Sequence, residues 1–342
     1  MKAIAYQSSL PIEHTDSLQD IERPIPQAFG HDLLIKIHAI AVNPVDCKIR
    51  QNVPASEGEY KVIGWDAVGE VIACGEQVSL FSVGDNVYYA GDLTRSGCNA
   101  EFQLVDERIV GRKPNTLNNA EAAALPLTTI TAYEMLFDRL QVRKVISATA
   151  KQTANERILV VGAAGGVGSI MLQLLKHLTK ATVIATASRV SSKQWVKDLG
   201  ADFVVDHTQP LAPQVLALEL GEMTHVVSLN GTDQYLDEYV EVLQPFGKLG
   251  LIDDPENVDI KKLKRKSLSL HWEFMYTRSM FNTADMIEQH NLLNEIANLV
   301  DNGVIKTTLS ETLGKINSAN LKKAHSLIES RKAMGKLVLE GF

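Results

Sequence analysis

A glycine-rich turn between an apolar run and a helical pattern is the feature of this chain best suited to chemistry. The run Arg157–Val161 ends in Gly162-Ala163-Ala164-Gly165-Gly166-Val167-Gly168, and apolar residues then recur at helical spacing up to Leu178. Residues almost without side chains let backbone N–H groups approach a pyrophosphate at the start of a helix. The pattern predicts a dinucleotide site, although alanine replaces the first glycine of G-x-G-x-x-G; a turn that only packs a helix closely on a sheet is the alternative. The residues expected to hold the cofactor here are Ala164, Gly165, Gly166, Val167 and Gly168.

Basic and hydroxyl side chains follow the next expected strand. An NAD-preferring site usually has Asp or Glu about twenty residues after the glycines, where it binds the ribose 2′-hydroxyl. This chain has Ser188 and Arg189 there, with Lys193 one turn further. Such groups attract a 2′-phosphate, so the sequence favours NADPH over NADH. The alternative is that Arg189 and Lys193 only solvate the start of a helix.

Residues at the ends of later strands are expected to complete the cofactor site. Asn230 ends the fourth strand of the alternating region and Ile252 ends the fifth. In a doubly wound sheet these positions border the crevice where ribose and nicotinamide would lie. His207 follows the third strand and is assigned to the border of the adenine.

Length and composition describe a soluble globular protein with room for two domains. The chain has 342 residues, of which 45% are hydrophobic and 22% charged, and a formal charge of −7. This charge argues against nucleic acid and anionic membranes as principal partners. Three scattered cysteines do not make a disulfide framework, and neither a signal peptide nor a membrane-spanning run is recognisable. We therefore expect a cytoplasmic protein.

The elements that must position these residues change in kind along the chain. Up to about residue 117, short strands and turns predict a β-rich domain, with strands at Leu33–Val42, Val68–Cys74, Asn86–Tyr89 and Glu101–Val105. A helical stretch from Asn119 to Leu140 is interrupted near Pro126. Six later strands with helical crossovers predict a doubly wound parallel sheet. They are Arg157–Val161, Thr182–Thr186, Asp202–Val205, His225–Leu229, Lys248–Ile252 and Ser267–Glu273.

The last segment changes pattern again. A helix is expected at Ala284–Val300, an extended stretch at Gly303–Leu309, a second helix at Asn320–Ser330 and a strand at Gly335–Glu340. We expect this segment to rejoin the N-terminal domain, so that the dinucleotide domain is an insertion.

The order and spacing of several segments resemble the medium-chain dehydrogenase/reductase superfamily, and within it the zinc-free quinone oxidoreductases related to zeta-crystallin. The matching segments are Ala41–Asp46, Gly64–Val71, Val83–Val87, Ala123–Ala132, the glycine turn and Leu199–Asp202. Proteins of this kind are often catalogued as zinc-type alcohol dehydrogenases.

This resemblance implies an α/β protein of two domains. A GroES-like, β-rich catalytic domain would comprise residues 1–128 and 281–342, and a Rossmann domain with a doubly wound six-stranded parallel sheet would comprise residues 129–280. NADPH and hydride transfer in a cleft between the domains are also implied. The resemblance places Thr131 against the cofactor; a helix hydroxyl bonded to its own backbone is the alternative.

Zinc is not expected, because the ligands of the zinc branch of that superfamily are missing. That branch binds its catalytic ion with a cysteine, the histidine of Gly-His-Glu and a later cysteine. Here Gly64-Trp65-Asp66 stands at the place of Gly-His-Glu, and tryptophan cannot bind zinc. Cys47 lies near the place of the first cysteine without partners to complete three protein ligands, and Cys98 alone stands where structural zinc needs four cysteines.

Without a Lewis acid, a conjugated acceptor is favoured over a simple aldehyde. Hydride delivered to a quinone or an α,β-unsaturated carbonyl moves charge onto an oxygen, which then needs only hydrogen-bond donors and a weak acid. Asn43 is the best candidate for the donor, and Tyr60 is a candidate to line the slot and donate a proton. A turn amide before Pro44 is the alternative for Asn43, and a packing role for Tyr60.

The leading hypothesis is an NADPH-dependent, zinc-independent oxidoreductase that transfers hydride to a quinone. The alternatives are an NADPH-dependent alkenal/enone double-bond reductase and a non-catalytic NADPH-binding protein with a structural or RNA-binding role. At the expected sheet edge, Leu268, Leu270 and Trp272 alternate, and an apolar edge strand invites pairing with a second subunit. We therefore expect a homodimer.

Overall fold

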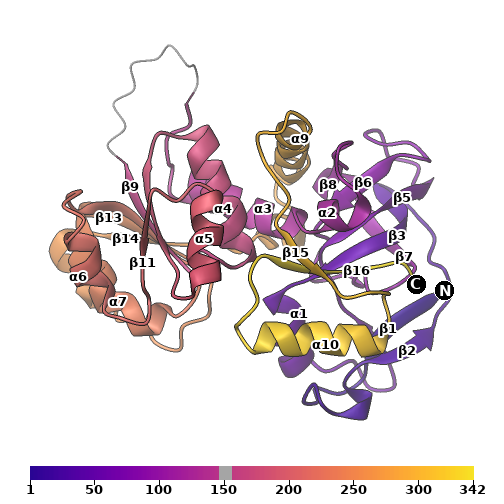
Figure 1. Cartoon of the computed structure of the whole chain (residues 1–342). Coiled ribbons are helices and arrows are strands. Elements are labelled where there is room, and N and C mark those ends of the chain that lie inside the picture. Colours follow the sequence, from indigo (N-terminus) through magenta and orange to yellow (C-terminus); the bar gives the residue numbers. More distant parts are fainter. Residues whose placement is uncertain (146–155) are drawn as a thin grey trace. The chain divides into compact units, whose positions relative to one another are not determined.

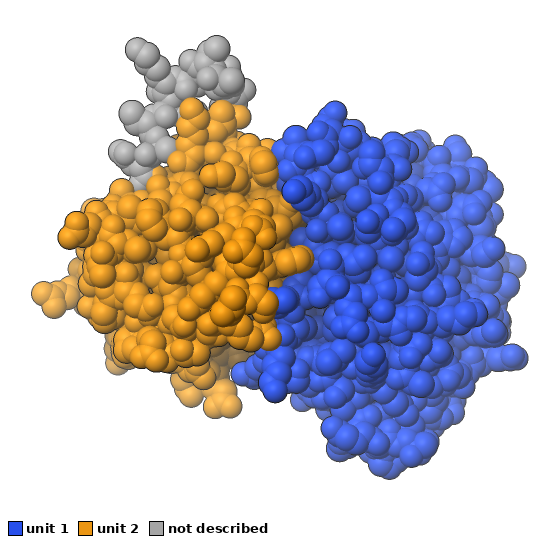
Figure 2. Space-filling model, in the orientation of Figure 1, with its two compact units in different colours: residues 1–130, 276–342 blue, residues 131–275 orange. Residues whose placement is uncertain are grey.

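The computed structural model describes residues 1–145 and 156–342. These residues form two compact units, one made of residues 1–130 and 276–342 and the other of residues 131–275 (Figure 2). The chain therefore leaves the first unit once and returns to it.

Two mostly antiparallel sheets build the first unit. The smaller has the order β2-β1-β4, and the larger has the order β15-β16-β3-β5-β6-β8, with β7 also paired to β3. The last strand of the chain, β16, pairs with β3, so the C-terminal segment joins the N-terminal sheet. The bounds are β1 (Lys2–Tyr6), β2 (Gln19–Glu22), β3 (Asp32–Val42), β4 (Lys61–Val62), β5 (Ala67–Cys74), β6 (Asn86–Tyr89), β7 (Phe102–Asp106), β8 (Val110–Arg112), β15 (Leu309–Thr312) and β16 (Lys336–Glu340).

The strands predicted for the first unit are confirmed, with one correction near the C-terminus. The expected extended stretch Gly303–Leu309 was wrong, because the chain turns at Gly303, where φ is +72°, and the strand begins only at Leu309. A glycine in this left-handed conformation ends the preceding helix without a Cβ clash.

Helices of the first unit cover its sheets or connect its strands. Pro44 opens α1 and Pro126 opens α3, so Pro126 starts a helix instead of kinking one. The bounds are α1 (Pro44–Asn52), α2 (Asn119–Ala123), α3 (Pro126–Tyr133, running into the second unit), α8 (Thr277–Met280), α9 (Glu288–Asp301) and α10 (Ser318–Glu329), with the 3-10 turns η1 (Thr15–Ser17) and η2 (Glu107–Ile109).

A parallel six-stranded sheet with the order β11-β10-β9-β12-β13-β14 forms the second unit. Figure 1 shows α4 and α5 together on one side of this sheet and α6 and α7 together on the other. The doubly wound fold is thereby confirmed. The strands are β9 (Arg157–Val161), β10 (Thr182–Thr186), β11 (Phe203–Val205), β12 (Met223–Ser228), β13 (Leu243–Leu251) and β14 (Ser269–Trp272). The helices are α4 (Gly166–Leu178), α5 (Val190–Asp198), α6 (Leu211–Leu216), α7 (Thr232–Val242), the π-helix η3 (Glu134–Arg139) and the 3-10 helix η4 (Ile260–Lys266).

One boundary in this sheet differs from the prediction. The fifth strand was expected to begin at Lys248, after Pro245. Instead β13 begins at Leu243, and its register with β12 shifts between Met223 and His225. A bulge accommodates the proline because the shifted residues leave the hydrogen-bond ladder there.

The centre of the parallel sheet is buried on both faces. Leu159, Ile184, Val226 and Leu249 come from four neighbouring strands and belong to one buried cluster, and Ile158, Val183 and Val227, which alternate with them, are buried as well. Strands covered on both faces read as continuous apolar runs, which explains why β9 and β10 were recognisable from sequence alone.

Candidate functional site

Two glycines of the turn between β9 and α4 are required by the turn itself. Gly162 has a φ of +80°, and a Cβ there would lie 2.9 Å from Asn230 Oδ1. At Gly168 a Cβ would overlap the backbone of Ala163. Both positions therefore exclude larger residues before any ligand is considered.

Gly165 differs, because the space beside it is not filled by the protein. The nearest atom to a Cβ at this position would be the Gly162 carbonyl oxygen, at 3.4 Å. Gly165 is the N-cap residue of α4, whose first turn carries no acidic residue and no side-chain cap, whereas Lys176 and His177 lie in its last turn. The helix thus presents uncapped N–H groups and the positive end of its dipole, which fit a pyrophosphate at Ala164–Gly168.

The carboxyl ends of neighbouring strands bring most of the predicted cofactor residues together. Ser188, His207, Asn230 and Ile252 each follow the end of a strand by one or two residues. Backbone bonds hold this edge in order: Ala187 N–H donates to the Val205 carbonyl (3.0 Å) and Ile252 N–H to that of Ser228 (3.3 Å). In open α/β sheets, ligands bind beyond this edge.

The basic residues after β10 differ in exposure. Arg189 is exposed and stands at the N-cap of α5, and Ser188 is half-buried. Lys193 is half-buried, and its Nζ binds Asp206 Oδ2 at 2.8 Å. The hydrogen bond from Lys193, together with two from Thr208, holds the pKa of Asp206 well below its usual range. Lys193 therefore already has an anionic partner after β11, which the sequence did not indicate.

His207 and Asn230 have fixed surroundings. The His207 carbonyl accepts a hydrogen bond from Tyr235 Oη (3.0 Å), which holds the loop after β11. Asn230 is exposed, with its amide oxygen against Gly162. The glycine turn and the end of β12 thus form one surface, as the cofactor prediction requires.

In the first unit, Asn43 is buried inside a hydrogen-bond network. Its Nδ2 donates to the Ala41 carbonyl (3.3 Å) and to Asp66 Oδ2 (3.2 Å), and its Oδ1 accepts from Lys336 Nζ. The residue is 1% exposed. Both ends of the amide have partners within the unit, which agrees with the turn-amide alternative; donation to a substrate carbonyl stays a prediction.

Two carboxyl groups and one ammonium group share this buried region. Lys336 Nζ lies 2.9 Å from Asp66 Oδ2, and the Asp66 Oδ1 accepts from Leu127 N–H (3.1 Å). Asp46 Oδ2 accepts from Asn43 N–H (2.5 Å), and burial raises the pKa of Asp46 to about 7. No local pattern could indicate this network, since Lys336 and Asn43 are 293 positions apart.

The surroundings of Tyr60 and Thr131 are apolar packing and a helix interior, respectively. Tyr60 packs, half-buried, against a small apolar cluster that contains Ala3, Ala5, Val62 and Ala100. Thr131 is buried in α3. The packing alternative for Tyr60 therefore has direct support, and the roles of both residues at a reacting group stay predictions.

Sequence comparison decides the family. Residues 30–115 match the alcohol dehydrogenase GroES-like domain, and residues 199–339 match the zinc-binding dehydrogenase family. A zinc-type alcohol dehydrogenase-like protein of Staphylococcus aureus is 36% identical over 340 residues, which are 99% of each chain. The chain belongs to the medium-chain dehydrogenase/reductase superfamily.

Solved structures of this superfamily share the whole fold. A Rhizobium etli protein provisionally named a zinc-dependent alcohol dehydrogenase has 53% identity and a TM-score of 0.95, over 100% of this chain and 98% of its own. Escherichia coli quinone oxidoreductase, solved with NADPH, has a TM-score of 0.82 at 23% identity, over 99% of this chain and 100% of its own. The similarity to the Escherichia coli enzyme supports only the assignment of the fold.

The residues of this medium-chain dehydrogenase/reductase do not fit the zinc that its relatives' names imply. Trp65 is 1% exposed, and its Nε1–H donates to the Asp92 carbonyl (3.0 Å), so no ligating lone pair is available there. Its ring meets Tyr276 edge to face, with centroids 6.3 Å apart. Cys98 is buried, with its thiol directed at the Asp66 carbonyl.

Cys47, His325 and Glu329 do meet, which the sequence had not indicated. Their ligand atoms lie within 4.8 Å of one another. The Arg50 guanidinium, however, donates from Nε to His325 Nδ1 (3.3 Å) and also binds Glu329. A fixed cation already bound to two of the three groups would repel a metal ion, so this cluster is an unfavourable metal site.

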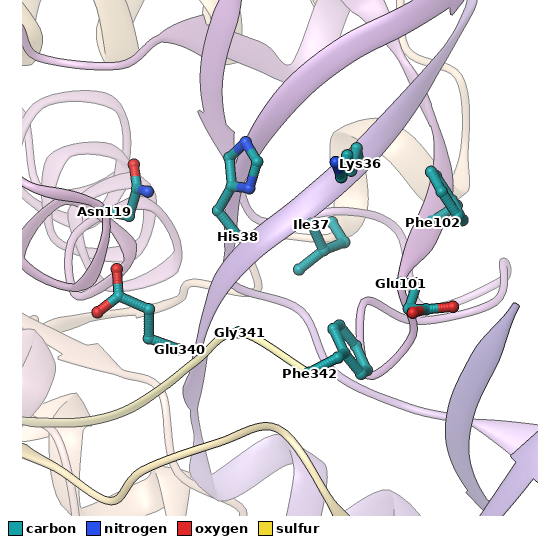
Figure 3. A pocket seen from close by; sticks show the side chains of 9 residues that line it. All are labelled: Lys36, Ile37, His38, Glu101, Phe102, Asn119, Glu340, Gly341 and Phe342. Atoms are coloured by element: carbon teal, nitrogen blue, oxygen red, sulfur yellow. The ribbon is translucent and has the colours of Figure 1, made fainter.

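A hollow of about 350 Å³ in the first unit lies among other residues (Figure 3). Lys36, His38, Glu101 and Glu340 contribute charged or titratable groups to it, and Phe102 and Phe342 contribute rings. None of the predicted site residues lines it, so it is not the predicted substrate slot.

Proposed function

We propose that this medium-chain reductase binds NADPH through its second unit and transfers hydride to a quinone without zinc. The observation that carries the proposal is the carboxyl edge of the parallel sheet, where the open Gly165 position and the exposed Arg189 stand beside the ends of successive strands. NADPH, when bound, supplies the hydride. The protein would bind and orient it, with Ser188 and Arg189 as donors toward the 2′-phosphate and Asn230 and Ile252 bordering the ribose and nicotinamide.

Zinc independence is supported by the donor set in the first unit. A catalytic zinc site needs three protein ligands, and here the Trp65 indole, whose Nε1–H donates to the Asp92 carbonyl, stands where the zinc branch has its histidine. A conjugated acceptor suits such a site. The negative charge that develops on the acceptor's oxygen can be stabilised by hydrogen-bond donors alone.

An enone reductase is the second candidate. It is favoured by a 2-methylene-furan-3-one reductase of Solanum lycopersicum, which is 38% identical over 195 residues, 54% of this chain and 47% of that one. Its name describes reduction of a conjugated carbonyl compound, an acceptor that hydride from the proposed cofactor could also reduce.

A substrate screen with metal analysis tests the proposal. The purified protein should oxidise NADPH with quinones, faster than NADH, and should contain no stoichiometric zinc. Turnover of enones but not quinones would establish the second candidate. Binding of NADPH without any turnover of quinones, enones or simple aldehydes would support a non-catalytic role. One zinc per chain with activity lost on chelation would overturn zinc independence.

A further inference from the structure

The hollow of about 350 Å³ in the first unit lies where the strands beside β3 part. β7 pairs with β3 up to Lys36, and β16 pairs with it from Ala39 onward. On the side of β5, the register of β3 shifts between Ile37 and Ala39. A bulge of this kind bends its strand and redirects side chains, and bulges are frequent next to active sites. The hollow is therefore part of the architecture of the sheet.

Four segments far apart in the sequence supply its walls. They are Lys36–His38, Glu101–Phe102, Asn119 and Glu340–Phe342. All four belong to the first unit. The volume of the hollow is within the range of small-molecule sites, about 300–1,000 Å³. A ligand of modest size would thus contact several elements of the unit at once.

One ammonium and one carboxyl group of the hollow have no protein partner. Within residues 1–145 and 156–342, neither Lys36 Nζ nor the Glu340 carboxyl group forms a hydrogen bond or an ion pair. The Asn119 side-chain amide, which also lines the hollow, has no hydrogen bond within these ranges. Figure 3 shows Glu340 and Phe102 at opposite ends of the hollow. A donor, an acceptor and an apolar wall are therefore all open to a ligand.

The other ionisable groups of the hollow are already accounted for. Glu101 Oε2 accepts a hydrogen bond from a backbone N–H at 2.7 Å. Burial lowers the pKa of His38 below its usual value, so the ring is neutral at pH 7. Its Nε2 lies 4.0 Å from Glu70 Oε2, outside the lining of the hollow. One positive and one negative group are thus left to meet a ligand.

The apolar wall is made largely of rings. Phe102 and Phe342 are half-buried, and Ile37 between their segments is 4% exposed. Phe102 is the register partner of Lys36, so its ring and the lysine side chain leave the same face of the sheet. Aromatic rings pair favourably with a further ring, offset or edge to face. An aromatic group on the ligand suits this wall.

We propose that the hollow binds a free amino acid with an aromatic side chain. Lys36 binds its carboxylate, Glu340 and Asn119 bind its ammonium group, and Phe102 and Phe342 pack against its ring. A zwitterion matches both unpartnered charges, whereas a simple amine or a simple carboxylate matches only one of them. The inference does not depend on the proposed cofactor site, because every residue that it uses belongs to the first unit.

A series of small probes tests the proposal on the wild-type chain. Ligand-observed NMR titrations at pH 7 should give saturable binding of L-phenylalanine with a Kd of about 1 mM or tighter. Phenethylamine lacks the carboxylate and 3-phenylpropionate lacks the ammonium group, so each should bind about tenfold more weakly through loss of one charge-assisted hydrogen bond. L-alanine keeps both charges but has no ring, and it should also bind about tenfold more weakly.

Two variants assign the charges to residues. Lys36→Met should weaken L-phenylalanine about tenfold and leave phenethylamine unchanged, because that probe has no carboxylate to lose a partner. Glu340→Gln should weaken L-phenylalanine by a similar factor and leave 3-phenylpropionate unchanged. Lys323→Met and Glu59→Gln, which alter exposed groups of the same unit outside the hollow, are the matched controls and should bind as wild type.

Three results would overturn the proposal. One is the absence of saturable L-phenylalanine binding to wild type. The second is phenethylamine binding as tightly as L-phenylalanine, which would make the hollow a site for cations. The third is a variant that weakens all probes alike. Lys36 and Glu340 are exposed, so both variants should unfold at the wild-type Tm; if one fails to fold, the probe series and the other variant decide.

Discussion

Single residues in the glycine turn have distinct physical tasks. Gly162 is required by its positive φ and Gly168 by contact with the Ala163 backbone, whereas Gly165 leaves open space at the start of α4. The motif alone could not separate these tasks, because all three positions are glycine. Of these three glycines, Gly165 is thus the one that close approach by a ligand can explain.

The 2′-phosphate assignment is tested at the residue scale. Ser188→Asp combined with Arg189→Ala should weaken NADPH binding by roughly 10- to 100-fold, because charge-assisted hydrogen bonds contribute about 1.5–3 kcal/mol each. NADH binding should change much less, since it lacks the phosphate. Isothermal titration of both dinucleotides measures the difference. Lys197→Ala, an exposed lysine on the same helix, is the control, and equal losses for NADPH and NADH would place the phosphate elsewhere.

At the scale of elements, one side chain of β16 ties the C-terminal segment to β3 and α1. Lys336 Nζ binds Asp66 and Asn43, and it also donates a hydrogen bond to the Val42 carbonyl at 3.3 Å. The two buried carboxyl groups nearby make this ammonium the main compensating charge. Strand pairing and electrostatics therefore act together at this joint.

Removing that ammonium should be costly. Lys336→Met leaves Asp66 buried without its partner and should lower the free energy of unfolding by about 3–5 kcal/mol, measured by urea denaturation. The double variant Asp66→Asn, Lys336→Met removes both charges and should recover part of that loss. A Lys336→Met protein as stable as wild type would show that the ion pair is not needed.

For the whole molecule, the parallel sheet has an exposed edge at β14. Trp272 and Phe274 are 49% and 48% exposed at or just beyond this strand. No helix among the described residues is long and apolar enough to cross a membrane. An edge strand with exposed rings favours association with a second copy.

The dimer is a prediction at this scale. Wild-type protein at micromolar concentration should sediment as a homodimer, and Trp272→Glu should shift it toward monomer by placing a charge on the paired edge. Phe246→Glu changes a ring that is 78% exposed elsewhere in the unit and should leave the dimer intact. A monomeric wild type would contradict the assignment of β14 as the contact.

Sequence by itself determined the doubly wound sheet, its strand-end residues and the family, because buried parallel strands and glycine turns depend on local patterns. Tertiary structure decided what distant side chains do. It buried Asn43 against Lys336, paired Lys193 with Asp206, put Arg50 between His325 and Glu329, and joined Arg139 to Glu273. Such pairings depend on packing between segments far apart in the chain, and no spacing along one segment encodes them.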